Sequence, residues 1–153
     1  MTGPVKLRLW VSSSIDDADL FAVVRHLSRD GAEVTYTGPM PGGPRIAAAY
    51  GWLRASHRKL DAARSTPYRP YHTHDDIQKL TPGDKVPLEI EIWPTSIVFP
   101  RGHRLVLAVG SHDDPRTTFQ HSDPDDRIQT GTNTIYTGGT FDSHLLLPVI
   151  PAR

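Results

Sequence analysis

Hydrophobic and polar residues alternate with a period of two along several short stretches of this chain. In the range 5–11 every odd-numbered residue is valine or leucine, and the even-numbered ones are lysine, arginine and tryptophan. The ranges 86–93 and 104–111 have a related pattern and are joined through a turn marked by Pro100 and Gly102. Because neighbouring side chains of a strand point to opposite faces, this pattern predicts strands with one face buried and the other in water.

The remaining segments predict more short strands separated by turns and loops. We expect strands over 20–27, 33–37, 132–136 and 144–150, a short extra one at 97–99, and a mostly extended stretch at 46–58. We expect loops over 38–44, 61–79 and 112–129. The Leu145–Leu147 run would be buried on both faces. Together these segments predict one all-β domain, 1–153, folded as an antiparallel β-sandwich of the jelly-roll type.

Composition supports this fold class and removes several classes of function. The 14 prolines and 12 glycines favour short elements joined by turns. The net charge of zero argues against nucleic-acid or anionic-membrane partners, and no apolar run approaches the ~20 residues of a membrane-spanning helix. The first residues lack the features of a signal peptide. The absence of cysteine excludes disulfides and thiolate metal sites, and is compatible with a cytoplasmic location, which we expect.

No complete catalytic motif of a serine hydrolase is present. The strained Gly-x-Ser-x-Gly turn that presents a nucleophilic serine does not occur. The serines 12–14 are followed by Asp16 and Asp17, but this grouping is typical of a polar strand end and turn. His103 lies in the Pro100–Arg104 turn and has no evident catalytic partner, so we interpret it as part of the scaffold. We therefore assign no catalytic residue.

Histidines and aspartates form three clusters that could suggest a metal. His72 and His74, followed by Asp75 and Asp76, would share one face of a strand, although zinc needs three or four converging ligands. The acidic segments 112–115 and 121–126 lack the residue order of a calcium loop and read as solvated turns. We therefore assign no metal ligand and no cofactor, and keep a metal-dependent enzyme only as a third hypothesis.

Aromatic side chains give the best candidates for contact with a ligand or another domain. They could stack on a sugar or a substrate ring, or belong to a core or an interface. The candidate contact residues are Trp52, Tyr68, Tyr71, His72 and His74, with Trp93 as a further aromatic. The loop 61–79, which holds four of them, is one candidate contact surface, since ordered loops of this length are uncommon without a function or a packing partner.

Several segments, taken in order, resemble the C-terminal domain of the X-prolyl dipeptidyl-peptidase and cocaine-esterase family of serine acyl hydrolases. No one segment is specific, but the ordered set is, and it covers nearly the whole chain. The matching segments are Thr2–Ser13, Gly51–Arg58, Leu80–Gly83, Ile92–Thr95, Phe99–Leu105, Asn133–Gly139 and Ser143–Pro151.

The resemblance implies a galactose-binding-like jelly roll that follows an α/β-hydrolase domain. In this family the catalytic serine, aspartate and histidine belong to the hydrolase part. The chain resembles the last domain alone, so we expect a piece of a larger enzyme, with a split gene product as the alternative. Its expected partner is therefore an α/β-hydrolase domain, in cis or, if the gene is split, in trans. A homo-oligomer is left open.

Two functional hypotheses of different classes follow. The first is a non-catalytic accessory domain of a serine acyl hydrolase, which supports the hydrolase domain and shapes its substrate pocket. The alternative is an autonomous carbohydrate-binding module, suggested by the jelly-roll fold and the aromatic residues. The second hypothesis predicts an exposed aromatic platform.

Overall fold

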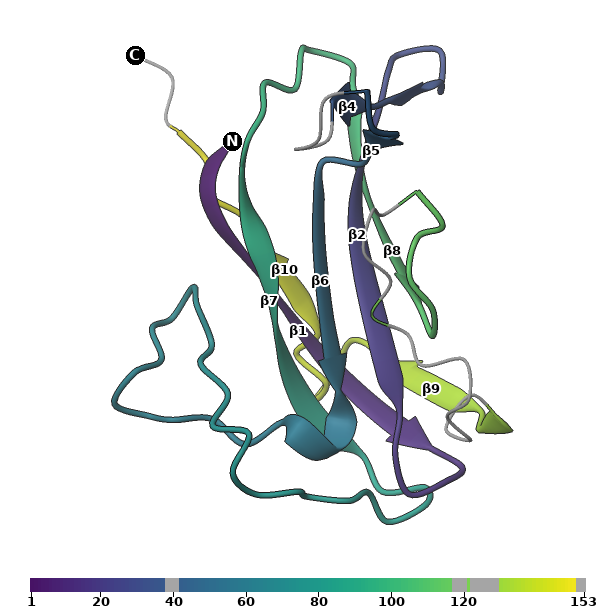
Figure 1. The fold of residues 1–153 in the computed structure, drawn as a ribbon, viewed down its shortest axis with the longest axis vertical. Coiled ribbons are helices and arrows are strands. Elements are labelled where there is room, and N and C mark those ends of the chain that lie inside the picture. Colours follow the sequence, from purple (N-terminus) through teal and green to yellow (C-terminus); the bar gives the residue numbers. More distant parts are fainter. Residues whose placement is uncertain (38–41, 117–120, 122–129, 151–153) are drawn as a thin grey trace.

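The computed structural model describes residues 1–37, 42–116, 121 and 130–150, and these form a nearly all-β protein (Figure 1). One short 3₁₀ helix, η1 (Ala55–His57), follows β6. The strands are β1 (Thr2–Ser13), β2 (Asp19–Leu27), β3 (Glu33–Val34), β4 (Tyr36–Thr37), β5 (Arg45–Ile46), β6 (Ala49–Arg54), β7 (Val86–Ser96), β8 (Arg104–Gly110), β9 (Asn133–Tyr136) and β10 (His144–Leu146).

All strand pairs are antiparallel, and most belong to one curled sheet. Its central path runs β10-β1-β7-β6-β2-β3, with β9 also pairing β1 and β8 also pairing β2. β4 and β5 form a separate two-stranded ribbon. The fold class predicted from the sequence, an antiparallel all-β protein, is confirmed, and the curled sheet agrees with a β-sandwich. The jelly-roll strand order stays a prediction.

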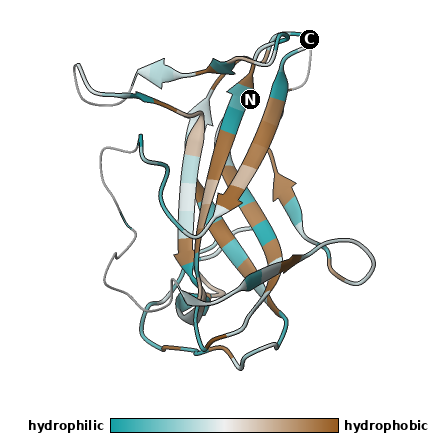
Figure 2. Cartoon of the chain, turned by 90° about the vertical axis from the view of Figure 1, so that its right-hand side faces the viewer, coloured by the Kyte–Doolittle hydropathy of each residue, from teal (hydrophilic) through white to brown (hydrophobic). Residues whose placement is uncertain are grey.

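The core lies on the inner side of the curled sheet and follows the alternation of the sequence (Figure 2). In β1 the odd-numbered residues from Val5 to Val11 are all buried, as predicted. Leu88, Ile90 and Ile92 of β7 join the same cluster, together with Leu20, Ala22 and Val24 of β2. The outer side of β2, β6 and β7 carries the alternate residues, and these include the aromatic Phe21, Trp52 and Trp93 and the charged Asp19, Arg54 and Glu91.

β7 and β8 do not pair with each other, although the sequence joins them through one short turn. β7 already has β1 along one edge and β6 along the other, so β8 pairs with β2 instead. The turn itself forms as expected, because the His103 amide donates to the Pro100 carbonyl at 3.0 Å and Gly102 has a φ of +86°. The turn therefore carries the chain from one part of the sheet to another.

The predicted strand at 97–99 is wrong. The Ile97 amide donates to the Met1 carbonyl, 2.9 Å away, which is the last backbone contact of this segment with the start of β1. None of the strands in the described ranges pairs with Val98 and Phe99, and Val98 is exposed. The chain leaves the sheet there and enters the turn.

The closing strand is shorter than predicted. β10 ends at Leu146, because Pro148 has no amide proton to extend the ladder. Leu146 is 38% exposed, so the expected burial of the leucine run on both faces is also wrong. β10 is an edge strand, and its alternate residues face water.

The mostly extended stretch at 46–58 is confirmed as β6, preceded by β5 and followed by η1. The range 33–37 is divided, because β3 pairs with β2 and β4 pairs with β5. The loop 61–79 contains no regular strand or helix. Parts of the predicted loops 38–44 and 112–129 lie outside the described residues. No helix in the described ranges has the length and apolarity needed to cross a membrane.

Candidate functional site: an aromatic and histidine cleft

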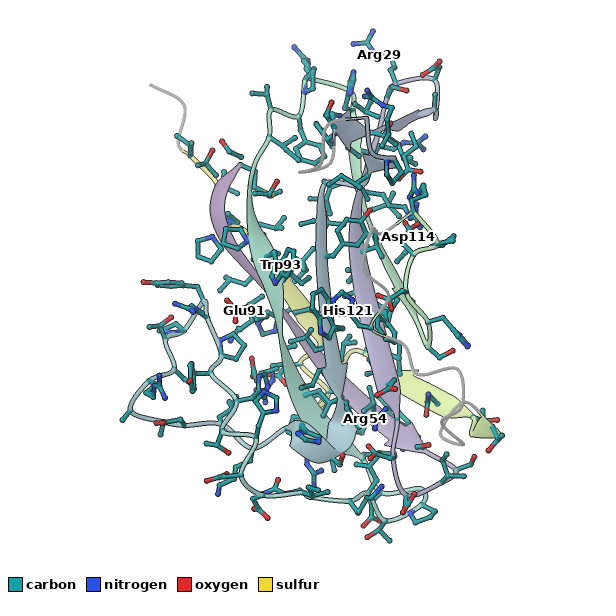
Figure 3. The ribbon with its side chains drawn as sticks, in the orientation of Figure 1. Arg29, Arg54, Glu91, Trp93, Asp114 and His121 are labelled. Atoms are coloured by element: carbon teal, nitrogen blue, oxygen red, sulfur yellow. The ribbon has the colours of Figure 1, made fainter. Side chains whose placement is uncertain are left out.

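A cleft of about 570 Å³ lies on the outer face of β2, β6 and β7. Its residues come from these strands, from η1 and from the 61–79 loop, with His121 added from further along the chain. In Figure 3 the side chains of Trp93, Glu91 and His121 gather over the middle of β6 and β7. A volume of this size is in the range of small-molecule sites.

Aromatic rings form the floor of the cleft. Phe21 and Trp52 are register partners on neighbouring strands, so their side chains emerge on the same face. The rings of Trp52 and Trp93 meet edge to face, with centroids 5.2 Å apart. Trp93 is 57% exposed, so much of its ring faces solvent. The three strands therefore carry a row of rings that ends in an accessible indole.

Gly51 brings β6 and β7 together beneath this floor. It is the register partner of Ile92, and its backbone lies directly against β7. A Cβ at this position would overlap the Glu91 carbonyl oxygen and would lie 2.8 Å from Ile92 Cγ1. The close approach of the two strands, and with it the meeting of Trp52 and Trp93, requires a residue without a side chain.

Histidines form one wall of the cleft. His57 Nδ1 and His74 Nδ1 are 3.0 Å apart, so one ring donates a hydrogen bond to the other. His74 has a φ of 55°, an uncommon conformation for a residue with a side chain. Burial, together with the neighbouring His74, lowers the pKa of His72. Both effects disfavour the protonated form of His72.

The nitrogens of these histidines do not converge on one point. The rings of His72 and His74 are 6.0 Å apart, and only His57 and His74 bring their nitrogens together. Within the described residues no group of three or more His, Cys, Asp or Glu side chains could hold a metal ion. The third hypothesis, a metal-dependent enzyme, therefore has no support from these histidines.

The charged groups at the cleft are paired. Arg54 donates two hydrogen bonds to Asp19, both of 2.9 Å, at one end. Arg69 Nε donates to Glu91 Oε1 at 3.1 Å and ties the 61–79 loop to β7. The His121 ring also belongs to the cleft, and it stacks on the Trp52 ring with the centroids 3.7 Å apart. The cleft thus has aromatic surfaces and balanced charges.

The structure brings only part of the predicted contact set together. Trp52, His72 and His74 line the cleft, whereas Tyr68 and Tyr71 are not among its lining residues. Tyr68 is 50% exposed on the loop, and the Arg64 guanidinium lies over the Tyr71 ring, 3.8 Å from its centroid. The sequence interpretation missed Phe21, His57, Glu91 and His121. Glu91 could have been found from the sequence, because it lies two residues from Trp93 in β7 and therefore on the same face. No feature of the sequence indicates that His121 belongs to the cleft.

The serine and aspartate cluster at the end of β1 contains a buried carboxylate, and its contacts agree with a structural role. Asp17 is buried, and one of its oxygens accepts the Ala18 and Ser56 amides at 3.0 Å. Lys79 Nζ donates to the other oxygen at 3.1 Å. Burial alone would raise the pKa of Asp17, but the hydrogen bonds from Ser56, Lys79 and Ala18 outweigh it and hold the pKa below its usual value.

His103 belongs to a chain of hydrogen-bonded rings at the other end of the sheet. His26 Nε2 and His103 Nδ1 are 2.8 Å apart, and His26 Nδ1 and the Tyr36 hydroxyl are 2.6 Å apart. His26 is 3% exposed and also packs on Phe99. Burial and the neighbouring His103 lower its pKa. This arrangement joins β2, β4 and the Pro100–Arg104 turn, and supports a scaffold role for His103.

The lowered pKa of His26 predicts a loss of stability in acid. Below the usual histidine pKa of 6.5, His26 binds a proton more readily in the unfolded chain than in the folded one. Acid therefore favours unfolding. We expect the free energy of unfolding to fall between about pH 7.5 and about pH 5.5, and to fall less in His26→Gln. Urea denaturation at the two pH values measures this. The exposed His144→Gln is the control, and an unchanged pH dependence in His26→Gln would contradict the prediction.

The chain is similar to known proteins in both sequence and fold. The family model for the X-Pro dipeptidyl-peptidase C-terminal non-catalytic domain matches residues 1–146. Two curated relatives, from Mycobacterium bovis and Mycobacterium tuberculosis, each bear the name "Putative serine esterase". Each is 31% identical over 121 residues, which cover 74% of this chain and 17% of the relative.

Two crystal structures of a CocE/NonD family hydrolase from Staphylococcus aureus share the fold. They superpose with TM-scores of 0.88 and 0.87, each at 34% sequence identity. The matches cover 98% and 99% of this chain but 28% of the solved chains. The chain therefore spans a minor part of the relatives that it matches.

Proposed function

Because the chain belongs to the family of X-Pro dipeptidyl-peptidase C-terminal non-catalytic domains, we propose that it is the accessory domain of a larger serine acyl hydrolase. The parent enzyme would cleave an ester or amide bond through an acyl-enzyme. This domain would support its α/β-hydrolase domain and shape the substrate pocket. The family match over residues 1–146 is the observation that carries the proposal, and the solved CocE/NonD hydrolases support it.

The surface supplies a place where a hydrolase domain could pack. At both lateral edges of the sheet, apolar side chains on the core side are only partly covered. These side chains, which we call the open side, are Leu105, Leu107 and Val109 of β8, Ile135 of β9 and Leu145 of β10. Ile135 pairs with the buried Val11 and still is 41% exposed. Val109 and Ile135 both line a hollow of about 230 Å³.

We assign the hydrolase domain of the parent enzyme as the occupant of the open side. The family description places a catalytic part elsewhere in the parent, and the matched relatives are several times longer than this chain. β8 also leaves one edge unpaired among the described strands, with no charged residue from Leu105 to Val109. An exposed apolar edge of this kind needs covering.

The isolated chain should have no serine hydrolase activity. We expect no serine-dependent turnover of p-nitrophenyl acetate and no labelling by a fluorophosphonate, because the chain lacks the nucleophile turn. A bacterial serine esterase is the positive control for both reagents. Turnover that is abolished by Ser13→Ala would sink the accessory-domain proposal.

The parent and its packing can be tested separately. The coding sequence next to this chain should encode an α/β-hydrolase, in frame for a partner in cis or as a neighbouring gene for one in trans. In the parent protein, the amides of residues 104–110 should exchange hydrogen more slowly than in the isolated chain. A neighbouring sequence without a hydrolase would overturn the parent assignment, and equal exchange would overturn the assigned surface.

We also propose that residues 1–153 form a single domain. We further propose a cytoplasmic location, and the absence of cysteine supports that location.

A further inference from the structure

We propose that the cleft on the outer face of β2, β6 and β7 binds a neutral pyranose ring, with the Trp93 indole as its platform. The cleft holds about 570 Å³, enough for a sugar of one or two rings. It lies on the outer face of the sheet, whereas the open side belongs to the core-facing side at its edges. The inference therefore goes beyond the hydrolase association and does not depend on it.

The balance of charge in the cleft favours a neutral ligand. Asp19 is paired with Arg54, and Glu91 is paired with Arg69. A cationic ligand would have to compete with Arg69 for Glu91, the more exposed of the two carboxylates, and an anion would be repelled by that same group. These ion pairs still present oxygens and N–H groups at the rim. Such groups can hydrogen-bond hydroxyls without any net charge to neutralise.

The aromatic floor matches the apolar face of a sugar ring. A pyranose presents C–H groups on its faces and hydroxyls around its edge, so it needs a flat apolar surface bordered by polar groups. Trp93 provides that surface, and its edge-to-face contact with Trp52 fixes the indole in place. Glu91 lies two residues away on the same face of β7, and the His57–His74 pair forms the adjacent wall. The Glu91 carboxylate can accept hydrogen bonds from ring hydroxyls, and the imidazoles can donate or accept them.

A quaternary ammonium is the main rival ligand, because it also binds aromatic faces. The paired state of Glu91 and the surrounding histidines give such a cation little electrostatic attraction. A flat aromatic acid is the second rival, and it would place its carboxylate near Glu91 and Asp19. Both rivals belong in the test as probes of opposite charge.

The test follows the indole signals of the ¹⁵N-labelled chain during titration. The probes are the methyl glycosides of β-glucose, β-galactose and α-mannose, tetramethylammonium chloride and sodium benzoate. We expect at least one glycoside to shift the Trp52 and Trp93 indole signals saturably, with Trp10 unmoved, and with a dissociation constant of the order of 1 mM. Trp93→Ala should weaken that binding at least about tenfold. The matched control is Tyr68→Ala, because Tyr68 is similarly exposed but lies outside the cleft.

A second variant protects the test from a folding failure. Glu91→Gln keeps the shape of the wall and removes its charge, and should weaken glycoside binding about threefold or more while the amide spectrum stays dispersed. No shift from any glycoside at about 50 mM would overturn the proposal. Stronger binding of tetramethylammonium or benzoate than of every glycoside would also overturn it, as would binding that Trp93→Ala leaves unchanged.

Discussion

Gly51→Ala should destabilise the protein by at least about 3 kcal/mol, the largest effect that we expect from a single added methyl group here. The new Cβ would overlap the Glu91 carbonyl oxygen and lie 3.0 Å from Ile92 Cα. Both neighbours are backbone atoms held in the sheet, so neither can rotate away. β6 and β7 would have to separate at the centre of the sheet.

A matched glycine provides the control for this prediction. Gly110 ends β8, and a Cβ there would have the His112 carbonyl oxygen as its nearest neighbour, at 3.9 Å. Gly110→Ala should change stability by less than about 1 kcal/mol. Urea denaturation followed by circular dichroism compares the two variants. A Gly51→Ala protein as stable as the Gly110→Ala protein would show that β6 and β7 do not approach this closely.

Asp17→Ala should cost about 3 kcal/mol at neutral pH. The substitution leaves the Ala18 and Ser56 amides without their acceptor, in a place where Asp17 is 1% exposed. Lys79 loses a partner too, but it is partly exposed and can be solvated. The main loss is therefore the hydrogen bonding of the buried amides, which join the turn after β1 to η1.

The neighbouring Asp16 is the control, since it also faces Lys79 but keeps about half of its side chain in water. Asp16→Ala should change stability by less than about 0.5 kcal/mol. The pKa of Asp17 is lowered in the folded chain, so its contribution is present above the unfolded pKa and lost as the pH falls through the folded value. Equal effects of the two substitutions at neutral pH would contradict the role of burial.

Much of the fold can be read from the sequence where alternation is strict. Val5 to Val11 and Leu88 to Ile92 fall on the predicted face because one side of each strand meets the core. Prediction failed where an apolar run lacks a neighbour, as at Val98, or where a proline ends the ladder, as at Pro148. Strand partners could not be predicted from alternation, since it says which face is buried and not which edge is paired.

The site was harder to predict than the fold. Trp52, His72 and His74 were selected for their chemistry and do line one cleft. Tyr68 was selected on the same grounds and lies outside it, because a loop without regular structure gives no rule for side-chain direction. His121 reaches Trp52 across almost seventy positions of sequence, a contact that depends on tertiary structure alone.

The position of β1 has a consequence for how the protein is made. β1 is the first strand of the chain, and its neighbours β7, β9 and β10 come from residues 86–146. A ribosome therefore releases the Leu7–Val11 segment long before any of its pairing partners exists. The sheet can close only when synthesis of this chain is nearly complete, and such distant pairing folds slowly. During that interval the nascent strand is an exposed apolar template, and it is the segment where we expect chaperones to bind.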